Sequence, residues 1–577
     1  MPALTCNKFG FVHTHPMSYD VRLRSLLGKG YFPKELPRAF TTSDFGRHAE
    51  DILSEWKAAK VFSENAPKSK VSGKKKAGSY TYGVKECGIE VISAPKRGHE
   101  RRDIHVTHPI PQALLVHEIS RNWSKLLKHL PQDSRSIDLL QILEAEPRGL
   151  SEIDFALHRR KKAYIEAQSD WIVRTDITRY YPSIYTHSLT WACYGKENVK
   201  TNRNKYEGSL ADRLDQLVRA ANRNQTVGIP VGPETSRILA ELIGRNIDKS
   251  VCGVSDDINS ASVDRLQDDW FVGTSNRETA ELALASISKS YRAFGLEING
   301  TKTSLEQVGA FVEDAELSEV RAFLSAIKFG LSGYRLQEFL SLVERLQARN
   351  PRTSAINYAV SVLEDRSFDR DDVEHIESFL LKGLALSPSS TSRICSLLLN
   401  LNYRSRFISH RRIGQRVKEL ANRAAELGHT FELIWLLWIL RGLKIRISSP
   451  KISHFVEEQS LPSLSLILLD MRSRGLFISN LPVSKWLDGV DDISSRGDPR
   501  WLIAYEGFRH GWLNDSKGLM LKPFFAPMAS RNVVFYDPRG NVAPSKRNVR
   551  RRTTKAQRRT RTFTRFLIST GFLDDTY

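Results

Sequence analysis

The chain is 577 residues long, which is enough for about three to four domains, and its 86 Lys and Arg against 65 Asp and Glu give a formal net charge of +21. A surplus of this size indicates a polyanionic partner, with nucleic acid favoured over a membrane surface. No apolar run reaches the roughly 18 residues of a membrane span, no signal-peptide core opens the chain, and the five cysteines form no Cys-x-x-Cys pair, which favours a reducing cytoplasm and argues against structural zinc.

Two basic segments precede the first strongly apolar strand. Residues 66–80 are rich in Lys, Gly and Ser, which predicts a basic loop that orders when a nucleic acid arrives. Residues 159–162 read Arg-Arg-Lys-Lys. Arg and Lys offset the charge of a triphosphate, and Arg can bind it with two hydrogen bonds, so Arg160 is a candidate phosphate contact. A charge run that only faces solvent is the alternative for each residue of this segment.

A buried strand is predicted at residues 171–177, where an apolar run (Trp-Ile-Val-Arg-Thr) leads to Asp176. Such a strand would deliver the carboxylate to a cleft at its end. Tyr181 follows in the stretch Thr178-Arg179-Tyr180-Tyr181-Pro182. Its ring would either belong to the core or meet a ligand.

A turn and a helix are predicted at residues 228–247. Pro230, Gly232 and Pro233 fix the turn, Thr235 or Ser236 can cap the helix, and Gly232 allows a nucleotide or template strand to approach the backbone closely. No Gly-Lys-Ser/Thr follows, so this is not a Walker loop. The apolar residues that recur at helical spacing are Ile238, Leu239, Leu242, Ile243 and Ile247.

The adjacent carboxylates Asp268 and Asp269 lie between apolar segments, where desolvating them is costly unless a positive charge neutralises them. Together with Asp176 they could hold two divalent cations, the arrangement used for in-line phosphoryl transfer. For the pair alone, a tight hairpin whose carboxylates face water is the alternative. The contrasting pair Asp256-Asp257 lies among Ser and Asn and is predicted to be a solvated loop.

Four motifs follow one another in a fixed order: Asp176 with Tyr181, the turn at 228–241, the pair Asp268-Asp269, and the segment 294–303, which contains Asn299 and Lys302. This succession resembles the palm of a reverse transcriptase. The sequence of the turn, Gly-Ile-Pro-Val-Gly-Pro-Glu-Thr-Ser-Arg-Ile-Leu-Ala-Glu, is similar to that of the bacterial defence reverse transcriptases of the abortive-infection and unknown-group clade. The resemblance covers roughly residues 20–310.

The resemblance implies roles for residues of each motif. Asp176, Asp268 and Asp269 would be catalytic and, with Ile177, would hold two Mg²⁺ ions, with Mn²⁺ as a substitute. Lys302 would protonate the pyrophosphate leaving group. Tyr181 would be the steric gate that excludes ribonucleotides. Residues 101–106, followed by Pro109 to Gln112, resemble the fingers strand that closes on the nucleotide. The remaining residues assigned to nucleotide binding are Arg102, Arg160, Gly232 and Pro233.

Two departures from the family pattern concern the surface beneath the primer end. Leu266 stands where the family commonly has an aromatic residue, with Gln267 beside it, and Val231 stands where many members have Gln. These changes leave the carboxylates intact. They put ordinary processive, template-faithful copying in doubt more than catalysis itself.

Beyond residue 315 helical periodicity dominates, and short segments joined by Pro, Ser and Gly predict stacked helix pairs, like an irregular solenoid. Residues 431–440 and 501–506 resemble the C-terminal helical domain of the same clade. Their Trp residues are interpreted as core rather than base-stacking platforms. From Arg539 to Phe566 the chain carries eleven Lys or Arg and no acid, so this tail is expected to order on RNA or DNA.

Some members of the clade build DNA on a hydroxyl of the protein itself. A tyrosine can replace the 3′-hydroxyl of a primer when a metal lowers the cost of generating an oxyanion. The candidates for such priming are Tyr577, at the end of the basic tail, and Tyr536 in the helical part. Ordinary terminal and core tyrosines are the alternative.

The resulting prediction is an α+β right-hand polymerase of the reverse-transcriptase type followed by an all-α helical-repeat domain. Its parts are 1–175 (N-terminal extension and fingers), 176–315 (palm), 316–538 (helical repeats) and 539–577 (basic tail). The expected activity is RNA-directed or untemplated DNA synthesis from dNTPs in antiphage defence, in the cytoplasm. The expected partners are an RNA template or non-coding RNA, the DNA product, and either further copies of the chain or a second defence component, without a membrane. The alternatives are a catalytically silent nucleic-acid-binding module and protein-primed, terminal-transferase-like synthesis.

Overall fold

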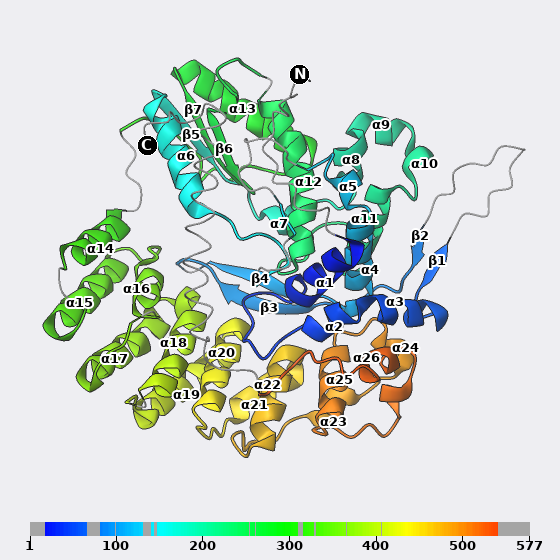
Figure 1. Cartoon of the computed structure of the whole chain (residues 1–577), viewed down its shortest axis with the longest axis vertical. Helices are drawn as coiled ribbons and strands as arrows, with labels where there is room; N and C mark the ends of the chain where they lie inside the picture. Colours follow the sequence, from blue (N-terminus) through cyan, green and yellow to red (C-terminus); the bar gives the residue numbers. More distant parts are fainter. Residues whose placement is uncertain are drawn as a thin grey trace, which may run out of the picture.

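The structure is a computed structural model, and it describes residues 18–65, 81–98, 100–130, 140–142, 147–252, 254–259, 261–309, 315–327, 330–364, 366–405 and 407–539. Within these ranges helices predominate, and the strands form three small antiparallel sheets, one of four strands and two of two strands. A mixed helix-and-strand part comes first and an all-helical part follows (Figure 1). None of the described helices is both long enough and apolar enough to span a membrane.

The N-terminal elements surround a long hairpin, β3 (Glu90–Pro95) and β4 (Arg101–Val106), in which Glu90 pairs with Val106 and Pro95 with Arg101. The strand predicted at 101–106 is therefore confirmed. Its neighbours are α1 (Tyr19–Gly30), α2 (Ser43–Arg47), α3 (Ala49–Ala58), β1 (Ser63–Asn65), β2 (Thr81–Gly83), α4 (Pro109–Arg121) and α5 (Trp123–Leu126).

A four-stranded antiparallel sheet in the order β6-β7-β5-β8 lies at the upper end of the molecule in Figure 1, beyond the hairpin. Its strands are β5 (Trp171–Thr175), β6 (Val263–Leu266), β7 (Asp269–Thr274) and β8 (Ser304–Gln307). Because side chains alternate along a strand, β7 turns Phe271 toward α6 (Phe155–Ala167) and Trp270 toward α13 (Arg277–Ala293). The helix α12 (Glu234–Val251) packs on α13, on the same side of the sheet as Trp270.

The predicted boundary at residue 175 divides this unit. The strand β5 lies inside the sheet, between β7 and β8, and α6 packs on β6 and β7. The sheet unit therefore begins near residue 155, because the strand that ends before Asp176 and the helix that precedes it share its core. The connecting helices are α7 (Tyr180–Ser183), α8 (Ser188–Tyr194), α9 (Lys196–Thr201), α10 (Arg203–Tyr206) and α11 (Leu210–Ala220).

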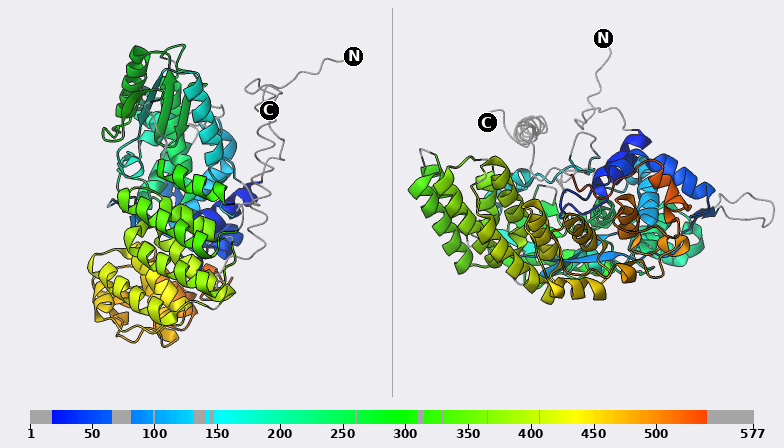
Figure 2. Two further views of the ribbon diagram at one scale, coloured as in Figure 1. Left: turned by 90° about the vertical axis from the view of Figure 1, so that its left-hand side faces the viewer. Right: turned by 90° about the horizontal axis from the view of Figure 1, so that it is seen from below.

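From α14 onward, neighbouring helices pack side by side in an arc, as the view from below shows (Figure 2). Stacked helix pairs were predicted for this region. Caps account for several helix starts, since Asp369 accepts from the amide of Asp372 and Ser409 from that of Arg412. The elements are α14 (Ala315–Ala326), α15 (Gly333–Arg349), α16 (Ala355–Glu364), α17 (Arg370–Leu386), η1 (Pro388–Ser390), α18 (Thr391–Arg404), α19 (His410–Glu426), α20 (Thr430–Gly442), α21 (Pro450–Glu458), α22 (Pro462–Ser473), α23 (Val483–Leu487), α24 (Asp492–Ser495), α25 (Trp501–Arg509), η2 (Leu519–Leu521) and α26 (Ala526–Ala529).

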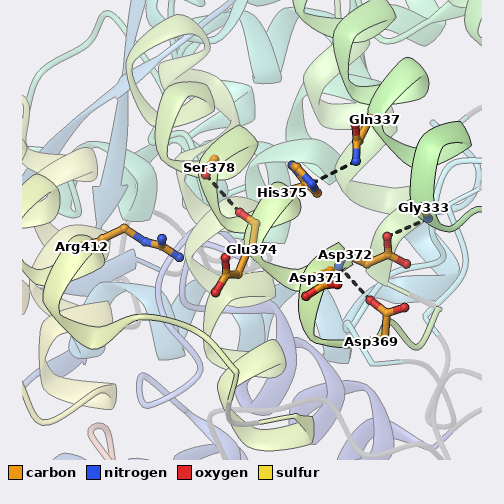
Figure 3. Close-up of a pocket in the computed structure, with 9 residues that line it drawn as sticks. All are labelled: Gly333, Gln337, Asp369, Asp371, Asp372, Glu374, His375, Ser378 and Arg412. Atoms are coloured by element: carbon orange, nitrogen blue, oxygen red, sulfur yellow. Dashed lines mark hydrogen bonds between the residues drawn. The ribbon is translucent and has the colours of Figure 1, made fainter.

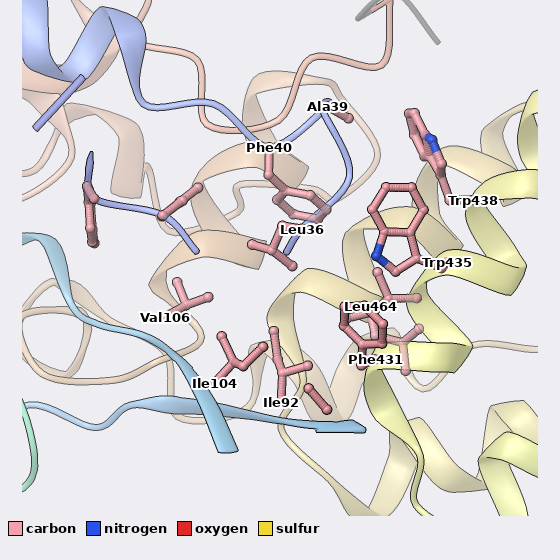
Figure 4. Close-up of a cluster of buried hydrophobic side chains, with 14 of the residues drawn as sticks. Leu36, Ala39, Phe40, Ile92, Ile104, Val106, Phe431, Trp435, Trp438 and Leu464 are labelled. Carbon is pink, nitrogen blue, oxygen red and sulfur yellow. The ribbon is translucent and has the colours of Figure 1, made fainter. Parts of the chain in front are cut away.

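The helical part and the N-terminal hairpin share one apolar core (Figure 4). Trp435 and Trp438 of α20 are buried beside the segment Leu36–Phe40 and the hairpin residue Ile92. The indole Nε1 of Trp435 donates to the carbonyl of Glu35 at 2.9 Å. The interpretation of these Trp residues as core is confirmed, since they are 6% and 2% exposed.

Three features predicted from the sequence lie outside the described residues. They are the basic loop at 66–80, the basic tail beyond Arg539, and Tyr577 at its end. Asp256 and Asp257 are described, and both are exposed in a turn as predicted.

Candidate functional site: a carboxylate cluster at the edge of the central sheet

The pair Asp268-Asp269 lies on the turn between β6 and β7. Leu266 pairs with Asp269 across the hairpin, so Gln267 and Asp268 are the two residues of the turn. Gln267 has φ 58°, in the left-handed region, which a two-residue hairpin turn requires and which costs a residue other than Gly some free energy. Asp268 therefore lies on the turn itself, and Asp269 is the first residue of β7.

Asp176 lies directly after β5, the strand next to β7, and is 7% exposed. Its carboxylate Oδ1 accepts from the amide of Ile177 at 2.7 Å, and its backbone carbonyl accepts from the amide of Asn299 at 2.6 Å. The ammonium of Lys302 donates to its other oxygen, Oδ2. The motif at Asp176 and the segment 294–303 therefore meet here, and a hydrogen bond from Asp268 brings in a third motif.

The three carboxylates interact strongly with one another. Burial, a hydrogen bond with Asp176 and the charge of Asp269 raise the pKa of Asp268 to about 8. Asp269 is the more exposed of the pair, but the protein atoms around it partly desolvate its carboxylate, and this and the charge of Asp176 raise its pKa, while Lys302 and Lys162 lower it. Because two carboxylates can share a hydrogen bond only if one is protonated, the raised pKa of Asp268 favours its protonated form beside Asp176 when no cation is bound.

The carboxylates of Asp176, Asp268 and Asp269 are chemically suited to bind hard divalent cations. Such ions prefer carboxylate oxygens, and a cation would relieve the repulsion that keeps Asp268 protonated. In the residues that the structure describes, however, no group of three or more His, Cys, Asp or Glu side chains is already arranged to hold a metal ion. The positive charge at Asp176 is supplied instead by Lys302.

Lysines at two places contribute positive charge to this site. The hydrogen bond with Asp176 raises the pKa of Lys302, so its ammonium stays protonated at neutral pH. Lys162, on α6, lies 5.3 Å from the ring centre of Phe271 and acts on Asp269 across the edge of the sheet. In the basic run at 159–162, Arg160 was singled out, but Arg159 and Arg160 are exposed to solvent.

Tyr181 is half-buried in the short helix α7. Its ring meets that of Tyr180 edge-on, with ring centres 5.6 Å apart, and its carbonyl accepts from the amide of Ile229 at 3.0 Å. Tyr180 is buried, with its hydroxyl on the carbonyl of Ala240. Of the two adjacent tyrosines, Tyr181 is the one that remains partly accessible.

Gly232 serves a different purpose from the one predicted. Its φ is 131°, and a Cβ there would lie 2.7 Å from Cγ of Pro33 and 3.0 Å from the carbonyl of His105. The close approach that Gly232 allows is therefore to the protein itself. The amide of His105 also donates to the carbonyl of Val231 at 2.7 Å, which fixes the turn to the N-terminal hairpin.

The predicted cap of the following helix is wrong. Pro233 is the N-cap of α12, and no side chain caps the helix. Thr235 accepts from the side-chain amide of Gln112, and Ser236 donates to the carbonyl of Pro230. Both hydroxyls therefore hold the turn to its surroundings.

Arg102 and Tyr536 are engaged elsewhere. Arg102 forms an ion pair with Glu35, at 3.2 Å. Tyr536 is fully buried in the helical part and its hydroxyl donates to Asp470 at 2.9 Å, and burial raises its pKa well above the ordinary range. A buried hydroxyl bound to a carboxylate cannot reach a nucleotide, so Tyr536 is withdrawn as a candidate for priming.

A cavity of about 500 Å³ lies in the helical part, far along the chain from the carboxylate cluster (Figure 3). It is lined mainly by the start of α17, with Asp369, Asp371 and Asp372, and by Arg412 of α19. Asp369 caps α17, and Asp372 accepts from the amide of Gly333. None of the residues that were predicted to act on a nucleotide lines this cavity.

Two residues near the carboxylate cluster, Arg265 and Lys162, were not singled out from the sequence. Arg265, on β6, is fully buried, and it forms ion pairs with Glu241 and Asp248 of α12. The only signal was the adjacent charged pair Asp264-Arg265 within a short strand, close before Asp268. Lys162 was indistinguishable from its basic neighbours, because only the helical rotation of α6 separates them.

No protein-family model matches the chain, and a search among curated proteins finds no match either. Among solved structures, the chain is similar to apo telomerase from Candida Tropicalis, with 12% sequence identity, a TM-score of 0.28 and 74% of each chain covered. A likeness at this TM-score carries no argument about fold or function. The case for a function therefore rests on the residues of the chain itself.

Proposed function

We propose that the protein is a DNA polymerase of the reverse-transcriptase type that joins deoxynucleotides by two-metal nucleotidyl transfer. The observation that carries the proposal is the meeting of Asp176, Asp268 and Lys302, which come from three motifs of one ordered set. A merely structural turn would have no reason to place carboxylates so close together that one of them remains protonated.

The reaction needs a hydroxyl that attacks the α-phosphorus of a dNTP and a pyrophosphate that leaves. Asp176, Asp268 and Asp269 would hold two Mg²⁺ ions, which would neutralise the charge that develops on the phosphate oxygens. Lys302 is protonated and exposed by about half, so it can move from Asp176 to the leaving pyrophosphate and give it a proton.

Sugar selection is assigned to Tyr181. Tyr181 follows Asp176 by five residues and is partly accessible, whereas Tyr180 is buried and anchors the same short helix in the core. A ring that meets the 2′ position of the sugar would exclude ribonucleotides by its bulk. DNA is accordingly the proposed product.

The biological setting of the proposal rests on the sequence resemblance. The clade acts in antiphage defence, some members assemble as oligomers, and some make DNA without a template or on a protein hydroxyl. With a net charge of +21, the chain suits RNA or DNA as a partner. Untemplated synthesis is favoured by Leu266 and Val231, which depart from the family pattern beneath the primer end.

The test is incorporation of labelled dNTPs by the purified full-length chain, with Mg²⁺ or Mn²⁺, in the presence and absence of a primed RNA template. The variant Asp268→Asn/Asp269→Asn should lose incorporation while its melting temperature stays the same or rises, since it removes repelling charges. Proteinase digestion of the product before a denaturing gel shows whether the DNA is attached to protein.

The matched control is Asp256→Asn/Asp257→Asn, which changes an equally acidic pair on an exposed loop. This variant should incorporate nucleotides as the unaltered chain does. Undiminished incorporation by the Asp268/Asp269 variant would remove the catalytic assignment and favour a nucleic-acid-binding module instead.

A further inference from the structure

A buried arginine lies directly beneath the turn that carries the carboxylates. The guanidinium of Arg265 donates from Nη1 to the carbonyl of Gln267 at 2.7 Å, so it holds the first residue of the turn. Arg265 is fully buried and Gln267 is half-buried, so the bond lies in the partly buried layer directly under the turn. Gln267 precedes Asp268 and has the left-handed φ that shapes the turn.

The arginine is itself held by one face of α12. Its Nε and Nη2 donate to Asp248 at 2.6 and 2.9 Å, and its Nη2 donates to Glu241 at 2.8 Å. Glu241 and Asp248 are also buried, and both lie on the face of α12 that is turned to β6.

Gly244, which has no side chain, leaves the space for the guanidinium group between these two carboxylates. A Cβ at this position would lie 2.7 Å from Nη1 of Arg265 and 2.9 Å from the central guanidinium carbon. Glu241, Gly244 and Asp248 lie three and four residues apart, which puts them in line on one helix face. The helix therefore presents a slot shaped for a flat guanidinium group.

Fold stability alone does not account for this arrangement. A buried ion triad can usually be replaced by apolar residues of similar volume without loss of stability, because its desolvation offsets the attraction between the charges. The triad here carries two negative charges and one positive charge in a fully buried layer. What apolar residues could not replace is the hydrogen bond to the carbonyl of Gln267.

We propose that Arg265 is a positioning residue, which fixes the Asp268-Asp269 turn through the Gln267 carbonyl from a seat formed by Glu241, Gly244 and Asp248. This inference rests on the proposed polymerase function and deepens it. Arg265 touches none of the reacting atoms. Its effect is to hold two carboxylates in one geometry relative to Asp176, so that a cation does not have to order the turn when it binds.

The test compares Arg265→Lys and Gly244→Ala with Arg441→Lys in the full-length chain. Lysine keeps the charge at position 265 but lacks the planar fork, and alanine at 244 displaces the guanidinium. Arg441 is a matched control, since it is buried, pairs with the buried Asp470 and donates to the carbonyl of Pro538 within the helical part.

Three measurements separate positioning from general destabilisation. They are kcat and KM for dNTP incorporation, binding of Mn²⁺ alone by electron paramagnetic resonance, and amide exchange of peptides covering residues 263–270. Replacing a residue that supports the ligands of a metal typically costs about 10- to 100-fold in metal affinity or activity. We expect a fall of that order in kcat and in Mn²⁺ affinity for both test variants, with faster exchange of the turn and little change in KM.

Arg441→Lys should lower the melting temperature as much as Arg265→Lys while leaving kcat and Mn²⁺ binding unchanged. If kcat, Mn²⁺ affinity and turn exchange are the same in Arg265→Lys as in the unaltered chain, the positioning role is overturned. If Arg265→Lys does not fold, the neutral triple variant Arg265→Met/Glu241→Gln/Asp248→Asn replaces it. Full activity of that folded variant would overturn the role, and a large loss of kcat would support it.

Failure of the proposed function has a different signature. In that case the unaltered chain neither incorporates dNTPs nor binds Mn²⁺. Faster amide exchange of the turn in Arg265→Lys, but not in Arg441→Lys, would then still show that Arg265 orders the turn.

Discussion

The raised pKa of Asp268 gives the site a charge state that depends on pH when no cation is bound. The raised pKa of Asp268, about 8, means that the folded protein keeps a proton there which the unfolded chain releases above its ordinary value of 3.8. The stability that this proton contributes is complete below the unfolded pKa and is lost as the pH rises through the folded pKa.

Without a divalent cation, the free energy of unfolding is therefore expected to fall between pH 5 and pH 8, by at most about 4 kcal/mol from this group. Asp268→Asn should abolish that part of the fall, because an amide donates to Asp176 at every pH. Urea unfolding with EDTA at both pH values measures the difference. Asp256→Asn serves as the exposed control, and parallel pH profiles for Asp268→Asn and the unaltered chain would contradict the raised pKa of Asp268.

Sugar selection gives a second prediction for a single residue. Tyr181→Ala should let ribonucleotides enter and lower the preference for deoxynucleotides by roughly 10- to 200-fold, the range in which one excluded group discriminates. Tyr181→Phe keeps the ring and should keep the preference. The measurement is kcat/KM for dNTP and rNTP with each variant. An unchanged ratio in Tyr181→Ala would make Tyr181 a core aromatic.

At the scale of elements, the turn before α12 connects the central sheet unit to the N-terminal hairpin. Gly232 has φ 131° and lies against Pro33 and His105. Gly232→Ala should lower the free energy of unfolding by about 1–3 kcal/mol, since the side chain adds a clash to backbone strain. Urea unfolding measures it. Gly300→Ala is the control, because its Cβ would have nothing within 4 Å and should change stability little.

The elements show which parts of the structure the sequence could predict. Asp176 follows the apolar strand β5 and Asp268 precedes the apolar strand β7, and both strand patterns are visible in the sequence. Lys302 precedes β8, whose sequence Ser-Leu-Glu-Gln shows no such pattern. The cap at Thr235 or Ser236 could not be predicted correctly, because the hydroxyl of Thr235 accepts from the distant Gln112 and that of Ser236 donates to Pro230 within the turn. The predicted boundary at 175 falls inside the sheet unit, because β5 looks the same in sequence whether it begins a sheet or lies inside one.

The burial of both faces of β6 could not be predicted from the sequence either. Asp264 is buried against His158 of α6, and Arg265 is buried against α12. Charged residues in a strand normally indicate a solvent-exposed face. Only the placement of both helices shows that these charges are neutralised by partners far away in the chain.

At the scale of the whole molecule, the helical part and the N-terminal part are expected to unfold together, because they share one core. Trp435→Ala removes a side chain that is 6% exposed and should cost about 3–5 kcal/mol, with one unfolding transition by both fluorescence and circular dichroism. Tyr403→Ala, at a position 77% exposed, is the control and should cost little. Two separate transitions in the unaltered chain would show independent domains.

The basic tail supplies a prediction about nucleic acid. Removing residues 539–577 should weaken binding of RNA or DNA and reduce its salt dependence, by roughly 0.7–0.9 in the slope for each phosphate that the protein no longer neutralises. Incorporation on a short supplied duplex should persist. Replacing the eleven Lys and Arg of the tail by Gln keeps its length and should have the same effect. An unchanged salt slope in both variants would assign the tail to assembly or to a protein partner.

The contacts between the first and last described segments have a consequence for synthesis of the chain. Trp56 donates to the carbonyl of Phe524, the amide of Thr41 donates to Phe535, and Phe40 forms a bridge with Tyr536. These N-terminal residues leave the ribosome early, but their partners are translated almost five hundred residues later. The N-terminal part therefore cannot reach its final packing during translation, and the nascent chain must hold exposed apolar side chains until the end of the helical part emerges. Chaperone binding to stalled nascent chains should accordingly be released only when translation has passed Tyr536.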